Sequence, residues 1–240
     1  NLRFGPDPKL LKQLRNQRLL ALERRAKYLI FYLEDVVLLS HLGMTGSWRF
    51  EKTQKKHDHI RIALSDGRIL TYQDARRFGM FEVIKKAELE KSPRLLNLGV
   101  DPVSDDHFSG ALLHKIFNKS QVCVKVAIMN QNRVVGVGNI YASEALFLAG
   151  IHPKKLCSEI SKKEWSLLVR SIKRILFEAI ELGGSSIKNY KNAQGEQGSF
   201  QSLHFVYGRS GQACQFCQTS IQSQAIVGRN SFWCPHCQVL

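Results

Sequence analysis

The sequence has no apolar run near the ~20 residues that a membrane-spanning helix needs, and no secretory signal at its start. It has only six cysteines, four of them grouped near the C-terminus, which is not the pattern of a disulfide framework. It is also poor in acidic residues, with 20 Asp and Glu against 35 Lys and Arg. These absences argue against membrane and disulfide-stapled secreted proteins, and we expect a cytoplasmic protein.

The formal net charge of +15 favours a polyanionic partner, because binding one releases counterions and a basic surface steers acidic ligands. Nucleic acid is the first candidate and an acidic membrane surface the second. A soluble protein that is basic for no functional reason remains the alternative.

The first hundred residues predict β-structure. Apolar runs at 27–33 and 36–42 are split by two acidic residues, as in a hairpin. The runs at 59–64 and 68–74 flank the turn sequence "SDG", and "MFEVI" (80–84) adds a further strand. Short strands at close spacing predict a sandwich or barrel.

From about Asp105 the apolar pattern becomes helical. Ser161 and Glu164 have capping-box spacing, and the helix they open should end at "GG" (183–184). Its buried stripe is predicted to hold Trp165, Leu168, Val169, Ile172, Ile175, Leu176, Ala179 and Ile180. An earlier helix is expected from near Asn139 to Leu148. The polar, glycine-rich stretch 192–199 predicts a mobile loop. Strands in the first hundred residues and helices after them together predict the α+β fold class.

The tail holds two C-x2-C pairs sixteen residues apart: Cys214, Cys217, Cys234 and Cys237. This spacing predicts one structural Zn²⁺, because four thiolates complete a tetrahedral site and leave no open position. A tail of about thirty residues builds no core of its own, so the metal would supply most of its folding free energy. Free or redox-active thiols are the alternative.

Between the cysteine pairs, the runs 221–227 and 231–234 predict a hairpin with its turn at 228–230. Arg229 would lie at the tip, where a fixed guanidinium is suited to clamping phosphate bidentately. A solvated turn arginine is the alternative.

Two stretches in the middle of the chain are further candidates for contact with DNA. In "VVGVGNIYASEALF", glycines precede Asn139 at a helix start, where backbone N–H groups can bind phosphate; Asn139 as a plain N-cap is the alternative. Lys125 would add a second phosphate contact. In "TYQDARRFGMF", Arg76 and Phe78 would enter duplex DNA as cation and wedge. In the alternative interpretation, the arginines form ion pairs with Asp74 and Phe78 is buried in the core. Met44, taken by itself, is predicted to be a core residue.

These stretches together resemble the formamidopyrimidine-DNA glycosylase family, bacterial enzymes that excise oxidised purines such as 8-oxoguanine. The resemblance covers essentially all 240 residues. It rests on "RRAKYL", "HLGMTGSWRF", "KHDH", "DARRFG", "VGVGNIYASE", "GIHP", "VYGR" and "GRNSFWCPHCQ", in the family's order.

The resemblance implies an N-terminal β-sandwich (1–104, incomplete), a helix-two-turn-helix DNA-binding domain (105–205) and a zinc-finger hairpin (206–240). It implies a monomeric, nucleoid-associated glycosylase and abasic-site lyase that acts by base flipping on duplex DNA with oxidised purines or abasic sites. Stretch 192–199 would close over the flipped base. The implied site residues are Lys27 (catalytic), Met44, Arg76 and Phe78 (filling the vacated stack), His57, Lys125 and Tyr207 (DNA contacts), and Asn139 and Arg229 (phosphate clamp, with Arg229 also in the second elimination).

One departure bears on the chemistry. Family members begin with Pro-Glu, and that proline's secondary amine attacks the sugar C1′. This chain begins "NLRFGPDP", and Pro6 and Pro8 are internal. Either the sequence lacks the start of an active enzyme, which we favour, or it is a degenerate homologue that binds damaged DNA without chemistry. Smaller departures are Asn130 and Ser120, where the family often has Asp and Lys. A basic RNA-binding protein is a remote third possibility.

Overall fold

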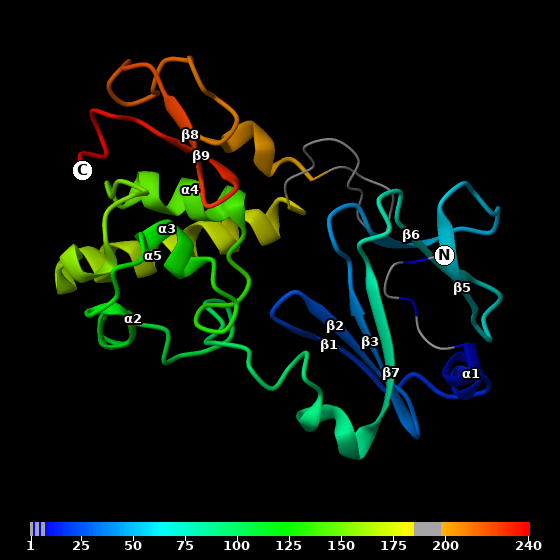
Figure 1. Ribbon diagram of the computed structural model, residues 1–240. Helices are drawn as coiled ribbons and strands as arrows, with labels where there is room; N and C mark the ends of the chain where they lie inside the picture. The colour runs from blue at the N-terminus through cyan, green and yellow to red at the C-terminus, as the bar shows by residue number, and fades with distance from the viewer. Residues whose placement is uncertain (1, 3–4, 6–7, 185–197) are drawn as a thin grey trace. The chain divides into compact units, whose positions relative to one another are not determined.

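The computed structural model describes residues 2, 5, 8–184 and 198–240, and the chain divides into two compact units (Figure 1). Unit 1 comprises Asn1–Asn97 with Ser185–Ser199, and unit 2 comprises Leu98–Gly184 with Phe200–Leu240. Each unit is described by itself.

Unit 1 contains two antiparallel sheets, with strand orders β1-β2-β3-β7 and β4-β6-β5. The strands are β1 (Ala21–Arg25), β2 (Tyr28–Tyr32), β3 (Val36–His41), β4 (Ser47–Phe50), β5 (Asp58–Ala63), β6 (Ile69–Gln73) and β7 (Met80–Lys85). Short helical turns lie at α1 (Pro8–Leu11), η1 (Lys12–Leu14) and η2 (Lys86–Lys91).

Aromatic side chains from both sheets form the core of unit 1. The Trp48 ring centroid lies 5.5 Å from those of Phe31 and Phe81. It lies 5.3 Å from that of Tyr72, which belongs to its own sheet. Because Phe31 and Phe81 come from the other sheet, the two inner faces interdigitate as a β-sandwich, which confirms the sequence-based expectation.

The hairpins of unit 1 follow the turn signals in the sequence. β2 and β3 pair as predicted, and Gly67 takes the left-handed φ of 82° in the turn between β5 and β6. Strand β1 was not predicted, because its residues are all exposed and show no alternation. Its two-residue turn to β2 places Lys27 at the tip of a hairpin.

Unit 2 is helical and carries a small hairpin at its C-terminal end. Its helices are α2 (Gly110–Phe117), α3 (Val124–Ile128), α4 (Asn139–Leu148) and α5 (Lys162–Glu181), with turns η3 (Cys157–Glu159) and η4 (Phe200–Leu203). Strands β8 (Gln222–Ile226) and β9 (Arg229–Trp233) form the hairpin. Within the described residues, no helix combines the length and apolarity needed to cross a bilayer.

Helix α5 forms as its sequence predicts. Ser161 and Glu164 cap each other reciprocally, and Gly183 and Gly184 follow its end with positive φ. Seven of the eight predicted stripe residues are buried, but Ile180 is 57% exposed. At about 100° per residue, Ile180 falls at the edge of the buried stripe, and it lies in the last turn of α5.

The tail packs on helix α4, beside which the hairpin lies in Figure 1. The Phe147 ring of α4 stacks on Phe205 and Phe216, with centroids 5.5 and 5.2 Å apart. Buried Val206, Ile221, Phe232 and two cysteines complete this small core. The tail therefore depends on α4 for its apolar contacts as well as on its cysteines.

Candidate nucleic-acid interface and metal centre

Four cysteine sulfurs lie together in the tail. The Sγ atoms are 4.0 Å apart for Cys214 and Cys237, 3.4 Å for Cys217 and Cys234, and 3.5 Å for Cys217 and Cys237. All four lie within 4.8 Å of one another. A tetrahedron with Zn–S bonds of ~2.3 Å has edges of ~3.8 Å, so the cluster fits one tetrahedral ion. The Phe216 N–H also donates to Cys214 Sγ at 3.4 Å, a contact that favours a thiolate.

The hairpin that carries Arg229 turns at 227–228, instead of at the predicted 228–230. Ile226 pairs with Arg229, and the turn residues Val227 and Gly228 have φ of 45° and 71°. Both central positions of a type I′ turn are left-handed; Gly228 takes the second, and Val227 adopts the first although it is β-branched. Arg229 is therefore the first residue of β9, beside the tip.

In the tail (206–240), Arg229 is the arginine whose guanidinium is available to bind a ligand. Residues 206–240 contain two arginines and no Lys, Asp or Glu. Arg209 donates to the carbonyls of Phe205 and Ala213 at 2.7 and 2.9 Å. Among the described residues, the Arg229 guanidinium has no hydrogen-bond or ion-pair partner.

Asn139 and Lys125 both reach the strand that Arg229 begins. Asn139 Nδ2 donates to the Asn230 carbonyl at 2.9 Å, and Lys125 Nζ donates to the same oxygen at 3.3 Å. The N-cap of α4 is Gly138, so the reading of Asn139 as a plain N-cap is wrong. Its side chain instead joins α4 to the hairpin, an interaction between residues 91 apart in sequence.

Lys125 is a buried cation. Its side chain is 2% exposed, and its Nζ donates to Ser231 Oγ at 2.6 Å. Burial, and then the nearby positive charge of Arg229, lower the pKa of Lys125 to about 8. The assignment of Lys125 as a DNA contact stays a prediction, since in this structure its ammonium group donates hydrogen bonds to the hairpin.

This pKa predicts how stability depends on pH. Between pH 8 and 10.5 the unfolded chain keeps the lysine proton that the folded chain has lost, so stability rises with pH. Relative to Lys125→Met, the parent should gain about 2 kcal/mol of unfolding free energy between pH 7 and 10. Chemical denaturation of both proteins at each pH measures this, and a constant difference would show that Lys125 does not titrate in this range.

Glu144 anchors the segment that enters the tail. Its fully buried carboxylate accepts the backbone N–H groups of Phe205, Val206 and Tyr207 at 2.7, 3.1 and 2.7 Å. Burial raises the pKa of Glu144, and the three N–H donors partly oppose that rise. Tyr207, a predicted DNA contact, is thus fixed through its backbone, and its ring lies 5.0 Å from that of Phe232.

In unit 1, the carboxylate of Asp74 organises the loop of Arg76 and Phe78. It accepts the N–H groups of Arg76 and Gly79 at 3.2 and 2.7 Å, and the Thr45 hydroxyl at 2.5 Å. Burial alone raises the pKa of Asp74, but hydrogen bonds from Thr45 and from nearby N–H groups outweigh it, so the pKa is lowered. The Thr45 bond also ties this loop to the turn that carries Met44.

The structural alternatives for this loop are wrong. Arg76 places its guanidinium over the Phe78 ring at 5.1 Å, and Asp74 bonds its backbone instead. Phe78 is 37% exposed and Met44 is 64% exposed, so neither is a core residue. A Cβ on Gly43 would lie 2.6 Å from the Phe78 carbonyl carbon, which shows how closely the two turns approach.

The remaining predicted site residues lie on turns of unit 1. Lys27 is exposed in the β1–β2 turn, and after burial its charge is the second factor that lowers the pKa of His41. His57 precedes β5 with φ of 72°, and its carbonyl accepts the Asp74 N–H at 3.0 Å. In stretch 192–199, only 198 and 199 are within the described residues.

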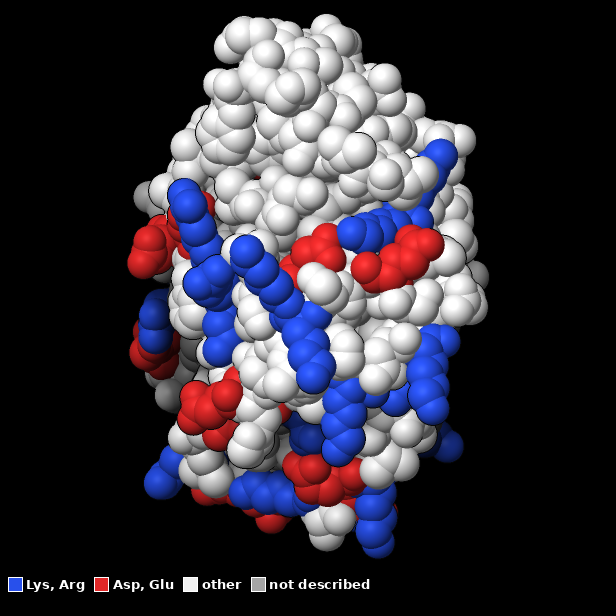
Figure 2. Space-filling model, turned by 90° about the vertical axis from the view of Figure 1, so that its left-hand side faces the viewer, with Lys and Arg blue, Asp and Glu red and all other residues white. Residues whose placement is uncertain are grey.

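The charge is not spread evenly over the surface. On the face drawn in Figure 2, Lys and Arg intermingle with Asp and Glu over the lower part. The upper part, at the height of the C-terminal tail, shows almost no charge. This face is therefore not a uniformly basic surface.

Similarity to known proteins now identifies the fold. Two family profiles match the chain: the formamidopyrimidine-DNA glycosylase N-terminal domain at residues 1–81 and the H2TH domain of the same enzymes at residues 98–191. The formamidopyrimidine-DNA glycosylase of Bdellovibrio bacteriovorus is 45% identical over 240 residues, 99% of this chain and 88% of the relative. The chain belongs to the formamidopyrimidine-DNA glycosylase family.

Solved members of the formamidopyrimidine-DNA glycosylase family have the same fold. The Lactococcus lactis enzyme, solved with DNA containing an abasic site, matches with a TM-score of 0.89 and 36% identity, covering 97% of this chain and 86% of that one. The Thermus thermophilus protein matches with a TM-score of 0.85 and 36% identity, covering 93% and 86%. The resemblance, the α+β class, the sandwich and the C-terminal hairpin with its cysteine cluster are thereby confirmed.

Three contributors to these sites were missed at the level of sequence: Asp74 as an anchor, Glu144 and Ser231. Asp74 sits next to the loop it holds, and an Asx-type turn signal could have indicated it. Glu144 and Ser231 act on residues 61 or more positions away, and no local pattern marks them.

Proposed function

We propose that this chain is a base-excision-repair DNA glycosylase that removes oxidised purines, namely 8-oxoguanine and formamidopyrimidines, and then cleaves the abasic site. The observation that carries this is the likeness to Lactococcus lactis enzymes solved with Fapy-dG-containing DNA, at a TM-score of 0.89 and 36% identity. The exposed Arg76–Phe78 loop and the unpartnered Arg229 provide the groups that such binding needs.

In the proposed reaction, an amine forms a bond to the sugar C1′ as the glycosidic bond breaks and the base leaves. The C1′–O4′ bond of the sugar ring then breaks, O4′ takes up a proton, and the nitrogen lone pair forms the C=N bond of an imine. Loss of a C2′ proton from the resulting imine expels the 3′ phosphate, and a second elimination expels the 5′ phosphate. Arg229 would assist the second elimination, and Lys27 would lie near the lesion phosphates. Pro6 and Pro8 are internal and have no free amine, so neither can be the nucleophile.

The four cysteines would hold one structural Zn²⁺, since four thiolates leave no open position for chemistry. We also propose that the protein acts as a monomer in the cytoplasm. Its sites would bind duplex DNA from both units, with Met44, Arg76, Phe78 and His57 in unit 1 and Asn139, Arg229 and Tyr207 in unit 2.

Borohydride trapping on an 8-oxoguanine duplex tests the reaction. We expect a covalent adduct from the chain preceded by the family's Pro-Glu start, and none from residues 1–240 alone, which should still bind the duplex. Binding by both proteins with no adduct from either would support the alternative of a damaged-DNA-binding homologue without chemistry.

Arg229→Ala should weaken binding to a lesion duplex about 30-fold, because a charge-assisted bond to phosphate contributes ~2 kcal/mol. The slope of log affinity against log salt should fall by about one. Fluorescence anisotropy at several salt concentrations measures both, and Arg209→Ala is unsuitable as a control because Arg209 braces the backbone. Unchanged affinity and slope, with metal content intact, would refute the clamp.

Phe78→Ala should weaken binding to a lesion duplex about tenfold, since a base-stacking side chain contributes ~1–3 kcal/mol. Binding to an abasic single strand should change little, because it has no stack to wedge. Phe50→Ala is the matched control, because Phe50 also has an arginine over its ring in the same unit: the Arg68 guanidinium lies 4.5 Å from the ring centroid. Equal losses on both substrates would make Phe78 a structural residue.

A further inference from the structure

Lys125 is a buried ammonium without a buried counter-charge. It is 2% exposed, and among the described residues no carboxylate forms an ion pair with it. Its hydrogen-bond partners are one hydroxyl, Ser231 Oγ at 2.6 Å, and one carbonyl, that of Asn230 at 3.3 Å. Burying a cation with neutral partners costs folding free energy. We therefore ask which part of the structure Lys125 holds in place.

Both partners of Lys125 immediately follow Arg229 in β9. Ser231 is fully buried, and its hydroxyl also donates to the Arg229 carbonyl at 3.1 Å. The Asn230 carbonyl accepts a second bond, from Asn139 Nδ2 at 2.9 Å. Two helices, α3 and α4, thus fix the backbone at the first three residues of the strand.

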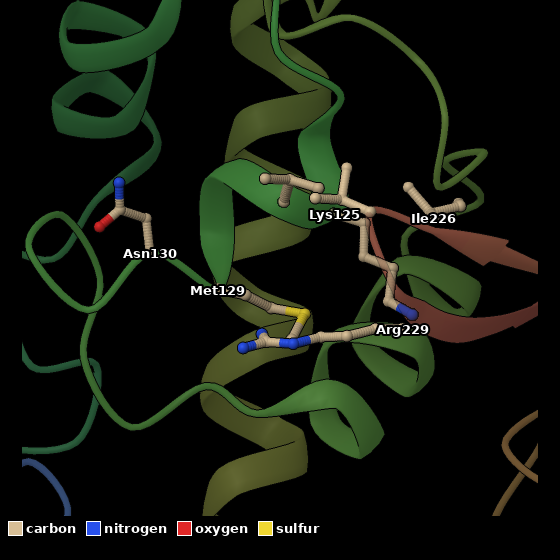
Figure 3. Close-up of a pocket in the computed structure, with 7 residues that line it drawn as sticks. Lys125, Met129, Asn130, Ile226 and Arg229 are labelled. Carbon is tan, nitrogen blue, oxygen red and sulfur yellow. The ribbon is translucent and has the colours of Figure 1, made fainter.

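The Arg229 side chain leaves this fixed backbone along an apolar wall. It lines a cavity of about 290 Å³ together with Lys125, Val126, Met129, Asn130, Ile226 and Val227. In Figure 3 its guanidinium passes beneath the Met129 sulfur, while the Lys125 nitrogen lies at the strand and Asn130 points away. The Arg229 charge is near enough to lower the pKa of Lys125, so the two cations repel each other.

We propose that Lys125 and Ser231 are a positioning pair, which sets the start of β9 and so aims the Arg229 guanidinium, rather than Lys125 being a contact to DNA. The proposal rests on the proposed function only in that Arg229 binds the phosphate of a lesion-containing strand. Ser231 acts as the link, because its oxygen accepts from Lys125 and its hydrogen is donated to Arg229.

A double-mutant cycle on binding to a duplex with a stable abasic-site analogue tests the pair. Lys125→Met and Ser231→Ala should each weaken binding about tenfold, and the double variant should lose little more than either single variant. Ser231→Thr keeps the hydroxyl and should bind like the parent. Ser223→Ala, on the neighbouring strand β8, is the matched control and should also bind like the parent. Among the described residues, the Ser223 hydroxyl contacts the exposed Ser210 hydroxyl and no other side chain.

A direct phosphate contact by Lys125 gives a different result. Ser231→Ala would then bind like the parent, and Lys125→Met would lower the salt slope by about one. Losses of binding free energy that add up in the double variant would likewise contradict the proposal that Lys125 and Ser231 act as a pair.

Amide hydrogen exchange at residues 229–231 provides a readout without DNA. Both single variants should exchange faster there by the same factor, with metal content unchanged, while Ser223→Ala should match the parent. If the parent fails to bind lesion DNA, the proposed function fails, but the exchange result still decides on the pair. Unchanged exchange in both variants would overturn it.

Discussion

Cys234→Ala is expected to lower affinity for a lesion duplex more than 100-fold. Three thiolates cannot complete a tetrahedral site, and structural zinc contributes ~10–16 kcal/mol to small folded units. Cys234 is also fully buried in the core that the tail shares with Phe147, so its loss should open the hairpin and release Arg229. Metal content by mass spectrometry and binding by anisotropy measure the two effects together.

Cys123→Ala is the matched control, because Cys123 lies outside the cluster at the start of α3. It should retain one metal ion per chain and bind DNA like the parent. A Cys234→Ala protein that kept its metal and its affinity would show that the cluster is not a structural zinc site.

Glu144→Gln is expected to cost about 2–4 kcal/mol of unfolding free energy. The Gln side chain has one acceptor oxygen, so its NH₂ group must face one of the three backbone N–H donors that the carboxylate now accepts. A buried donor left unpaired costs ~1–3 kcal/mol, and the bonds that remain lose their charge assistance. Chemical denaturation measures the loss, and DNA affinity should fall with it because Tyr207 loses its anchor.

Glu178→Gln controls for the substitution itself. Glu178 pairs with Arg174 on the surface of α5 at 2.7 Å, and exposed pairs of this kind contribute less than ~1 kcal/mol. If Glu144→Gln were as stable as Glu178→Gln, the carboxylate would not be the anchor of the tail segment.

The sequence predicted the features that depend on neighbouring residues. The two C-x2-C pairs sufficed for the cysteine cluster, because each pair lies in one tight turn and the intervening run forms a hairpin. The cap and stripe of α5 followed from Ser161, Glu164 and a spacing of three and four. In each case the signal lies within about twenty residues.

Features that depend on distant contacts were not predictable. Met44 looks like a core residue, and its exposure follows from a turn held by Thr45 and Asp74, 29 residues apart. Asn139 has the chemistry of an N-cap, but its partner is a carbonyl 91 residues away. The turn of the β8–β9 hairpin was predicted at 228–230 but lies at 227–228, because Val227 takes a conformation that its residue type disfavours.

We propose that the exposed Arg76–Phe78 loop and Arg229 recognise damaged duplex DNA. Anisotropy with two duplexes that differ only by one abasic-site analogue tests it most directly, at one salt concentration near 0.15 M. We expect at least about 100-fold tighter binding to the damaged duplex, and a preference about tenfold smaller in Phe78→Ala. Equal affinity of the parent protein for both duplexes would contradict it.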